Sequence, residues 1–305
     1  MAQGQFLIGS LVAAFLVGCR ALPHGAECWS LDGRPLVSPP TEPVALAQRE
    51  AELEHARAQW FVGEQDHNAA IWYARRLGYL GRYREAVDVL TKALDDHPGD
   101  PFLLRHRGHR WLTLREFGKA ERDFVLATDA LRNTPDEVEP DGQPTPGRPP
   151  HSSLHYNVHY HLGLVQFLLG DWWLAEHAWL CCLAVVDDDE SRVAVTHWLW
   201  CVRMRMGDLA GAAAVVAPIS PQMDIKENKS YHQLCLLYAG KLTRELIAPL
   251  AGSAGSALAF GLAHHRLLTG DREQARRELL ELSRQPAWSA FGVIAAEVEL
   301  ARFRR

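Results

Sequence analysis

Apolar residues recur along most of the chain at the three- and four-residue spacing of amphipathic helices, and glycines divide these helical segments into pairs. At four of the divisions a glycine is followed, five positions later, by an alanine. Because glycine can end a helix in a left-handed conformation, and alanine lets two helices approach closely, the pattern predicts antiparallel helix pairs. The turns begin at Gly81, Gly170, Gly207 and Gly270.

The helix pairs recur in a common register. About six repeats fit the chain, at 67–100, 101–134, 156–189, 193–226, 227–251 and 256–289. The fifth is degenerate, because Glu245 stands where a small residue is expected. The recurring glycine, alanine and apolar positions, with a period of about 34 residues, resemble the tetratricopeptide repeat (TPR). This resemblance implies an all-α fold, a TPR-like superhelical solenoid of antiparallel helix pairs in which each repeat packs mainly on its neighbours.

Three further segments complete the expected solenoid at 45–305. Residues 45–61 are expected to form a capping helix, and a C-terminal capping helix within 287–305 is expected to close the other end with a polar face. An insertion at 135–153 separates the second and third repeats. It is rich in proline and carries four acidic residues at 136–141, so it is not expected to be helical.

The first 19 residues have the pattern of an export signal. The apolar run Phe6–Gly18 has the length of a signal-peptide core and is short for a membrane span. It ends in Leu-Val-Gly-Cys19, which resembles the lipobox of bacterial lipoproteins. The resemblance implies a signal peptide at 1–19, lipidation of Cys19 and a lipid-anchored location in the bacterial cell envelope. Because no Lys or Arg precedes Phe6, an ordinary secretory signal, an uncleaved anchor and a cytosolic location stay open. Residues 20–44 contain five prolines and are expected to be a tether.

Composition narrows the class of protein. The chain has 305 residues, of which 48% are hydrophobic and 23% are charged, which excludes a disordered chain and a protein with many membrane spans. The formal net charge of −5 gives no overall basic field for nucleic acid. The length alone would suggest two domains, whereas the repeats predict one continuous array.

The inner faces of the first helices are the candidate binding surface, because a TPR array forms its concave groove there. Helical spacing places Arg, His, Asn and aromatic side chains on these faces. Such a surface suits a peptide or protein partner with acidic or carboxylate groups. The alternative is that these side chains pair with the protein's own acids, such as those of the insertion. The expected groove residues are Asn68, Arg75, Arg105, His109, Asn157, Tyr160, His197, Arg205 and His264.

Catalytic and metal-dependent functions have weaker support in the sequence. His155 and His159 have the four-residue spacing of paired metal ligands on a helix, but His151 precedes the expected helix and His161 points elsewhere. His109 and His197 could act with a carboxylate of the insertion as acid and base, but no nucleophile motif or phosphate-binding loop accompanies them. The prediction is therefore that the protein has no catalytic residues, metal or cofactor.

The functional expectation is a non-catalytic scaffold or adaptor of the cell envelope that binds a peptide or protein. The alternatives are a hydrolase or metal-dependent enzyme that uses the Arg and His residues of the groove, and a structural envelope protein that self-associates. The stretches Arg105–Arg110, Pro135–Gly142 and Asn157–Gly163 also resemble a group of exported bacterial TPR proteins. That likeness supports the fold and adds no chemistry.

Overall fold

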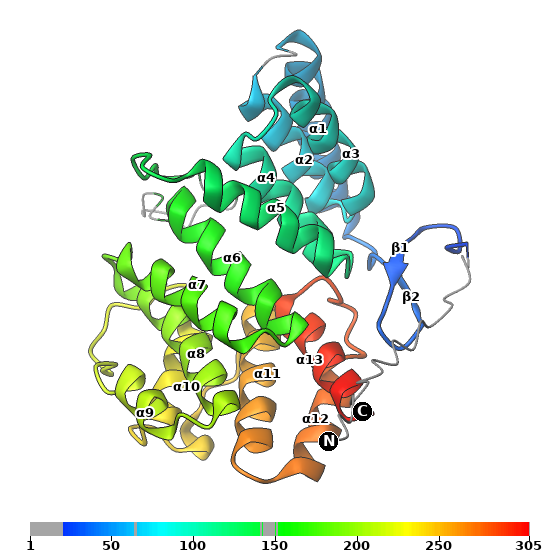
Figure 1. Ribbon diagram of the computed structural model, residues 1–305. Helices are drawn as coiled ribbons and strands as arrows, with labels where there is room; N and C mark the ends of the chain where they lie inside the picture. The colour runs from blue at the N-terminus through cyan, green and yellow to red at the C-terminus, as the bar shows by residue number, and fades with distance from the viewer. Residues whose placement is uncertain (1–20, 64–65, 141, 143–149, 151, 305) are drawn as a thin grey trace, which may run out of the picture.

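The computed structural model describes residues 21–63, 66–140, 142, 150 and 152–304 (Figure 1). The expected signal peptide and Cys19 lie outside these residues. None of the described helices is both long enough and apolar enough to cross a membrane. The described part is built from α-helices, with one short hairpin of two strands, β1 (Ala26–Trp29) and β2 (Pro35–Val37).

The helices follow one another in pairs along the chain, and the prediction of an all-α solenoid of helix pairs is confirmed. The pairs α2–α3, α4–α5, α6–α7, α8–α9 and α11–α12 correspond to repeats one to four and six. In the fifth repeat α10 is followed only by the short 3-10 helix η1 (Arg244–Leu246), as its degenerate sequence indicated. The helices are α1 (Pro43–Val62), α2 (His67–Tyr79), α3 (Tyr83–Asp96), α4 (Pro101–Thr113), α5 (Phe117–Ala130), α6 (Leu154–Leu169), α7 (Trp172–Ala184), α8 (Asp189–Met206), α9 (Leu209–Val216), α10 (Lys229–Tyr238), α11 (Gly252–Leu268), α12 (Arg272–Leu282) and α13 (Phe291–Arg302).

Local chemistry explains where the helices begin and turn. At the start of α4 the Asp100 carboxylate accepts hydrogen bonds from the backbone N–H groups of Phe102 and Leu103, which otherwise lack a partner. At the end of α6 Gly170 adopts a φ of 97°, a left-handed conformation that costs glycine little. Close packing within the pair requires another glycine, since a Cβ at Gly163 would lie 2.5 Å from the ring of Trp179.

The turn of the second repeat departs from the glycine pattern. Arg115 occupies the position that Gly81 has in the first repeat, and it adopts a φ of 66°. A left-handed conformation costs a residue with a Cβ about 1–2 kcal/mol. The contacts of the Arg115 side chain, described below, hold the backbone in this conformation.

The segment expected to be a tether contains the β1–β2 hairpin, and the hairpin is docked on the solenoid. Cys28 and Leu36 are buried against Val87, Leu114 and Trp288, which come from both ends of the solenoid. The Trp288 indole donates a hydrogen bond to the carbonyl of Val37 at 2.8 Å. Pro35 is the first residue of β2, where a missing N–H is tolerated, and Pro43 is the first residue of α1, so the prolines permit both a hairpin and the start of a helix within the expected tether.

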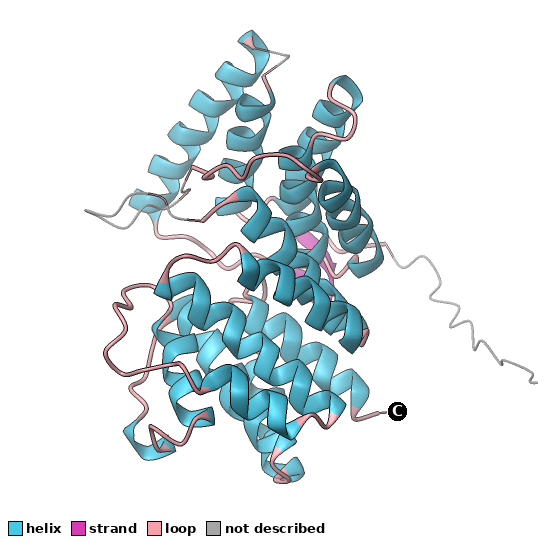
Figure 2. Ribbon diagram, turned by 60° about the vertical axis from the view of Figure 1, so that its left-hand side comes forward, coloured by secondary structure: helices cyan, strands magenta, loops and turns pink. Residues whose placement is uncertain are grey.

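The last helix, α13, lies within the fold and does not present the expected polar face to solvent. Eight of its 12 residues are buried. Neighbouring helices make most contacts in the solenoid, as expected, and Figure 2 shows helices stacked side by side in the half of the molecule that holds the C-terminus. In addition, α13 contributes Val293, Ile294 and Val298 to one hydrophobic cluster that extends back to Leu112 of α4. The solenoid therefore curls until its last helix meets its second repeat.

Candidate functional site

The inner faces of repeats two, three, four and six meet side chains of α13 or of the insertion. At the start of α13 the Phe291 ring lies 5.2 Å from the ring of His109 and 5.7 Å from that of His161. These two histidines come from α4 and α6, which belong to different repeats. A single aromatic side chain of the last helix thus fills the space between two first helices.

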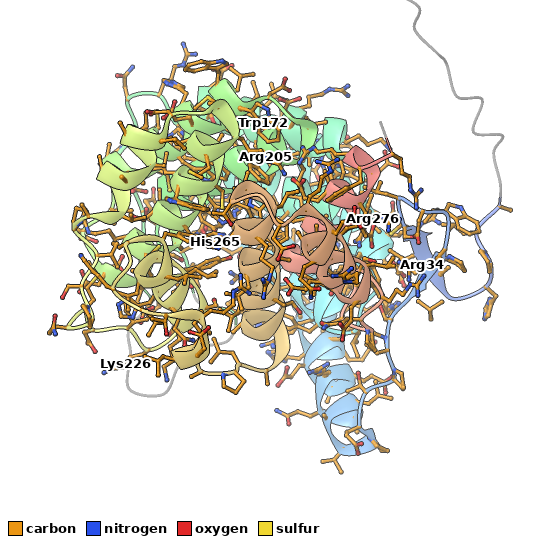
Figure 3. The ribbon with its side chains drawn as sticks, turned by 90° about the horizontal axis from the view of Figure 1, so that it is seen from below. Arg34, Trp172, Arg205, Lys226, His265 and Arg276 are labelled. Atoms are coloured by element: carbon orange, nitrogen blue, oxygen red, sulfur yellow. The ribbon has the colours of Figure 1, made fainter. Side chains whose placement is uncertain are left out.

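Two glutamates of α13 form buried ion pairs with this inner surface. Glu297 accepts two hydrogen bonds from Arg115, with Oε1–Nη2 at 2.8 Å and Oε2–Nε at 3.2 Å. Glu299 pairs with Arg205 of α8 and with Arg302, one turn further along α13. The Arg205 guanidinium also lies over the Trp172 ring at 5.6 Å (Figure 3). Arg205, expected to bind a partner, is therefore held by the protein's own carboxylate.

The insertion supplies a third internal acid. Glu139 is buried, and its carboxylate contacts Arg105 at 3.2 Å, His106 at 3.4 Å and the side-chain amide of Asn157. Burial alone would raise the pKa of Glu139, but the charge of Arg105 and the hydrogen bonds of His106 and Asn157 outweigh it and lower the pKa to about 2. Arg105 and Asn157 therefore pair with an acid of the protein's own insertion, which is the alternative that the sequence left open.

The histidines of the inner faces are uncharged; four of them are buried and His109 is partly buried. Burial lowers the pKa of His106, His161 and His197 to about 3. Burial also lowers the pKa of His109 and His264 well below the usual value, with Arg110 and Arg205 adding to the shift. Neutral imidazoles cannot attract an acidic ligand by charge. Tyr160, expected beside them, is likewise buried and accepts a hydrogen bond from Trp198 at 2.9 Å.

Two expected groove residues, Asn68 and Arg75, lie at a surface that is open. Three adjoining hollows form a continuous groove between α1 and α2, which we call the α1–α2 groove. Its wide end has a volume of about 470 Å³ and contains His55, Ala58, Val62, Asn68 and Trp72. Its other end is lined by residues of both helices and by Gly142 of the insertion; these are Ala45, Gln48, Arg49, Glu52, Arg76, Tyr79 and Gly142.

Trp72 and three arginines determine the chemistry of the α1–α2 groove. The guanidinium carbons of Arg75 and Arg76 lie 5.0 Å and 5.4 Å from the Trp72 ring centre. Arg76 pairs with Glu52 at 2.8 Å, Arg49 donates to the carbonyl of Tyr79, and Arg75 donates to the carbonyl of Pro140. Two arginines, Arg49 and Arg76, and one carboxylate, Glu52, therefore line this end of the groove, and Arg75 lies beside it against Trp72.

Trp72 and the contribution of α1 were not expected from the sequence. Trp72 is one residue beyond Ile71, which is buried in the core. Helix α1 had been given a capping role only. Its interrupted apolar pattern, with exposed Phe61 and Val62 at its end, was the available signal that one of its faces is not covered by the solenoid.

The structure does not assemble the residues of the enzymatic or metal alternatives. His109 packs on His161 and Phe291, whereas His197 packs on Tyr231 and Tyr238, so the two have separate neighbours. His151 lies outside the described residues. Among the residues that are described, no group of three or more His, Cys, Asp or Glu side chains is arranged to hold a metal ion.

Comparison with known proteins gives distant similarities. No protein-family model matches the chain. It is similar to YrrB, titled a TPR protein with an unusual peptide-binding site, at 15% identity and a TM-score of 0.44 over 74% of this chain and 97% of that one. It is also similar to a chain in the structure of Naa15/Naa10 bound to HypK-THB, at 14% identity and a TM-score of 0.38 over 82% of this chain and 36% of that one. The likeness is one of fold, and neither protein is a guide to the function of this chain.

Proposed function

We propose that this chain is a non-catalytic protein-interaction module whose α1–α2 groove receives an extended peptide segment of a partner protein. The observation that carries the proposal is the continuous groove, which runs along α2 from Asn68 to Tyr79. A helix of 13 residues is about 20 Å long, which equals the length of about six extended residues.

The two ends of the groove suit different parts of such a peptide. At the wide end Trp72, Ala58 and Val62 offer an apolar surface for one aliphatic or aromatic side chain. The side-chain amides of Gln59 and Asn68 have no hydrogen-bond partner within the described residues, so both can bind a peptide backbone. At the other end the arginines favour acidic side chains or a terminal carboxylate.

The test is selection of binding peptides from a random nine-residue display library on the full chain, followed by calorimetry with the selected peptides. We expect an enriched pattern of one large apolar residue followed by acidic residues. Trp72→Ala should weaken binding at least tenfold. Because Trp72 is partly buried, Ala58→Glu serves as a second variant, since Ala58 is exposed on α1 and a longer side chain there obstructs the groove without disturbing the core.

The matched control is Trp173→Ala, because Trp173 of α7 is 75% exposed and lies outside the groove. Its peptide affinity should equal that of the unchanged protein. Selected peptides that bind the Ala58→Glu and Trp72→Ala variants as tightly as the unchanged chain would refute the proposal, as would a selection without enrichment.

We further propose that the chain is exported and anchored in the bacterial envelope through a lipid on Cys19. The support is the apolar run that ends in Leu-Val-Gly-Cys19. Mass spectrometry of the mature N-terminal peptide from the bacterial host tests this, with a diacylated Cys19 expected. An unmodified Cys19 in the mature chain would contradict it.

Self-association is a second candidate, favoured by an apolar face on α7. Trp173, Leu174 and Leu180 are all exposed there, and soluble monomers rarely expose such side chains together. Sedimentation of the full chain tests it. If the protein self-associates through α7, Trp173→Glu should convert the oligomer to a monomer; a monomeric unchanged chain would reject the candidate.

A further inference from the structure

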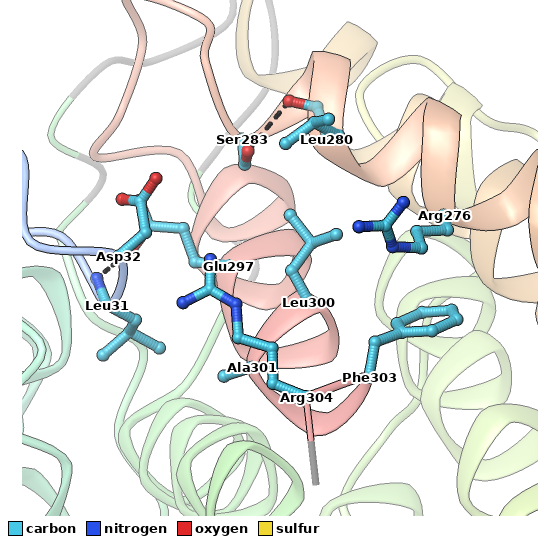
Figure 4. Close-up of a pocket in the computed structure, with 10 residues that line it drawn as sticks. All are labelled: Leu31, Asp32, Arg276, Leu280, Ser283, Glu297, Leu300, Ala301, Phe303 and Arg304. Carbon is cyan, nitrogen blue, oxygen red and sulfur yellow. Dashed lines mark hydrogen bonds between the residues drawn. The ribbon is translucent and has the colours of Figure 1, made fainter.

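A second pocket lies between the docked hairpin and the last two helices, α12 and α13. Its wall is formed by the hairpin residues Leu31 and Asp32, by α12 and its end, and by α13 and the residues that follow it (Figure 4). We propose that this hairpin pocket binds a carboxylate carried on a short branched aliphatic stem. Neither the repeat architecture nor the α1–α2 groove accounts for this pocket.

The apolar part of the pocket determines the size of the stem. Leu31, Leu280, Leu300 and Phe303 contribute aliphatic and aromatic surface, and the volume is about 100 Å³. An apolar cavity of about 150 Å³ is known to hold one benzene molecule. The hairpin pocket therefore accommodates one group of the size of a leucine or isoleucine side chain.

Two arginines supply the positive charge. Arg276 of α12 and Arg304 beyond the end of α13 both line the pocket, and Figure 4 shows their guanidinium groups pointing toward it from opposite sides of Leu300. Neither side chain has a hydrogen-bond or ion-pair partner among the described residues. A guanidinium group at the edge of an apolar hollow is suited to a carboxylate, which can accept two parallel hydrogen bonds from it.

The acidic residues of the pocket do not cancel this charge, because both are already neutralised. Asp32 accepts hydrogen bonds from Arg34 at 3.0 Å and from the Ser30 hydroxyl. Glu297 forms the buried pair with Arg115 and also accepts a hydrogen bond from the backbone N–H of Leu31 at 3.2 Å. The unpaired charge that a ligand would meet is that of Arg276 and Arg304.

The hairpin is held in place by contacts that do not involve Arg276 or Arg304. Arg34 donates to the carbonyl of Ser283 at 2.9 Å, and Figure 3 shows Arg34 and Arg276 on the same side of the molecule. The pocket thus exists without a ligand. A ligand that contacts Leu31 and Arg276 together would add to the attachment of the hairpin and raise the thermal stability of the full chain.

The ligand chemistry can come from a free branched carboxylic acid or from the last residue of a peptide. Calorimetry with the full chain should therefore use three probes: 4-methylpentanoate, a five-residue peptide ending in leucine with a free carboxylate, and the same peptide with an amidated C-terminus. We expect the first, the second or both to bind, which identifies the source, and the amidated peptide to bind at least tenfold more weakly than its free form.

Substitutions separate this site from a general attraction of anions. Arg276→Gln combined with Arg304→Gln should weaken binding at least tenfold. Arg277→Gln is the matched control, because Arg277 is the neighbouring exposed arginine of α12, bonds Gln274 and does not line the pocket. Trp72→Ala should leave binding of these probes unchanged, because Trp72 lies in the α1–α2 groove and not in the hairpin pocket. The two sites are therefore tested independently.

Three results would overturn the inference: equal affinity for the amidated and free peptides, equal weakening by Arg277→Gln, or no binding of any probe at about 5 mM. The last limit corresponds to a free energy of binding weaker than about −3 kcal/mol.

Discussion

Replacing Arg115 by alanine removes the contact that joins the second repeat to the last helix. The guanidinium makes two hydrogen bonds to Glu297 and donates further bonds to the carbonyls of Thr113 at 2.6 Å and Trp288 at 2.9 Å. The Arg115 and Glu297 side chains are 3% and 2% exposed, so water cannot replace the lost partner. The variant leaves a buried carboxylate without its cation.

The expected cost follows from this burial. Breaking a buried ion pair by removing one partner costs about 3–5 kcal/mol of unfolding free energy, because the remaining charge stays desolvated. The backbone contributes separately, since Arg115 has a φ of 66°. Glycine accepts this conformation more readily than alanine, so Arg115→Gly should be more stable than Arg115→Ala by about 1 kcal/mol.

Urea unfolding of the full chain, followed by circular dichroism, measures these differences. Arg82→Ala is the matched control, because Arg82, the residue before α3, pairs at the surface with Glu85 in the first turn of that helix and should cost less than about 1 kcal/mol. The double variant Arg115→Ala, Glu297→Gln should cost less than the sum of the two single variants, since neutralising Glu297 removes the unpaired charge.

The reasoning would be refuted if Arg115→Ala cost no more than Arg82→Ala. It would also fail if the two substitutions at Arg115 and Glu297 were additive, because the closing contact would then contribute nothing beyond its separate parts.

Three further predictions follow from the interior. The five histidines of the inner faces, four buried and His109 partly buried, bind protons in the unfolded chain near pH 6.5 but not in the folded one. Stability should therefore be complete above about pH 6.5 and decline below it by up to about 1.4 kcal/mol per pH unit for each histidine. Urea unfolding at pH 7.5 and 5.5 measures this decline; His197→Phe removes one of these protons and should reduce it, and an unchanged decline would count against the account. Gly163→Ala should lower the free energy of unfolding by about 1–3 kcal/mol, because the new Cβ meets Trp179. Gly118→Ala is the control: the space around Gly118 is open, so this variant should be neutral or stabilising. Equal shifts of the melting temperature in the two variants would contradict the packing argument. Glu139→Gln should remove the ion pair with Arg105 and so speed limited proteolysis within the insertion. Glu137 is exposed, so Glu137→Gln should leave the cleavage rate unchanged. Identical cleavage rates in the two variants would show that Glu139 does not hold the loop.

Sequence pattern was sufficient for the helix pairs because their causes are local. The glycine at a turn, the alanine five residues later and the aspartate at a helix start act on neighbouring residues. The same periodicity placed Arg105, His197 and His264 on the inner faces, where the structure buries all three. It could not show what covers them.

The identity of the covering groups depends on residues far away in the chain. Glu299 reaches Arg205 across 94 positions, and no local pattern records such a pairing. One signal was present in the last helix itself. The stretch from Gly292 to Glu299 is apolar on almost every side, and a helix that is apolar all round is typical of an interior position and not of a polar cap.

The pairing of Arg115 with Glu297 has a consequence for how the chain folds. An open solenoid can unfold from its ends, one repeat at a time, because each repeat depends only on its neighbours. Here a contact between residues 182 positions apart must form before the second repeat has all its partners. Folding of the middle of the chain therefore waits for the last helix to be synthesised, and loss of that helix removes support from the second, third and fourth repeats together. The array should therefore behave more as one cooperative unit than an open solenoid does, and it should be slow to fray from its ends.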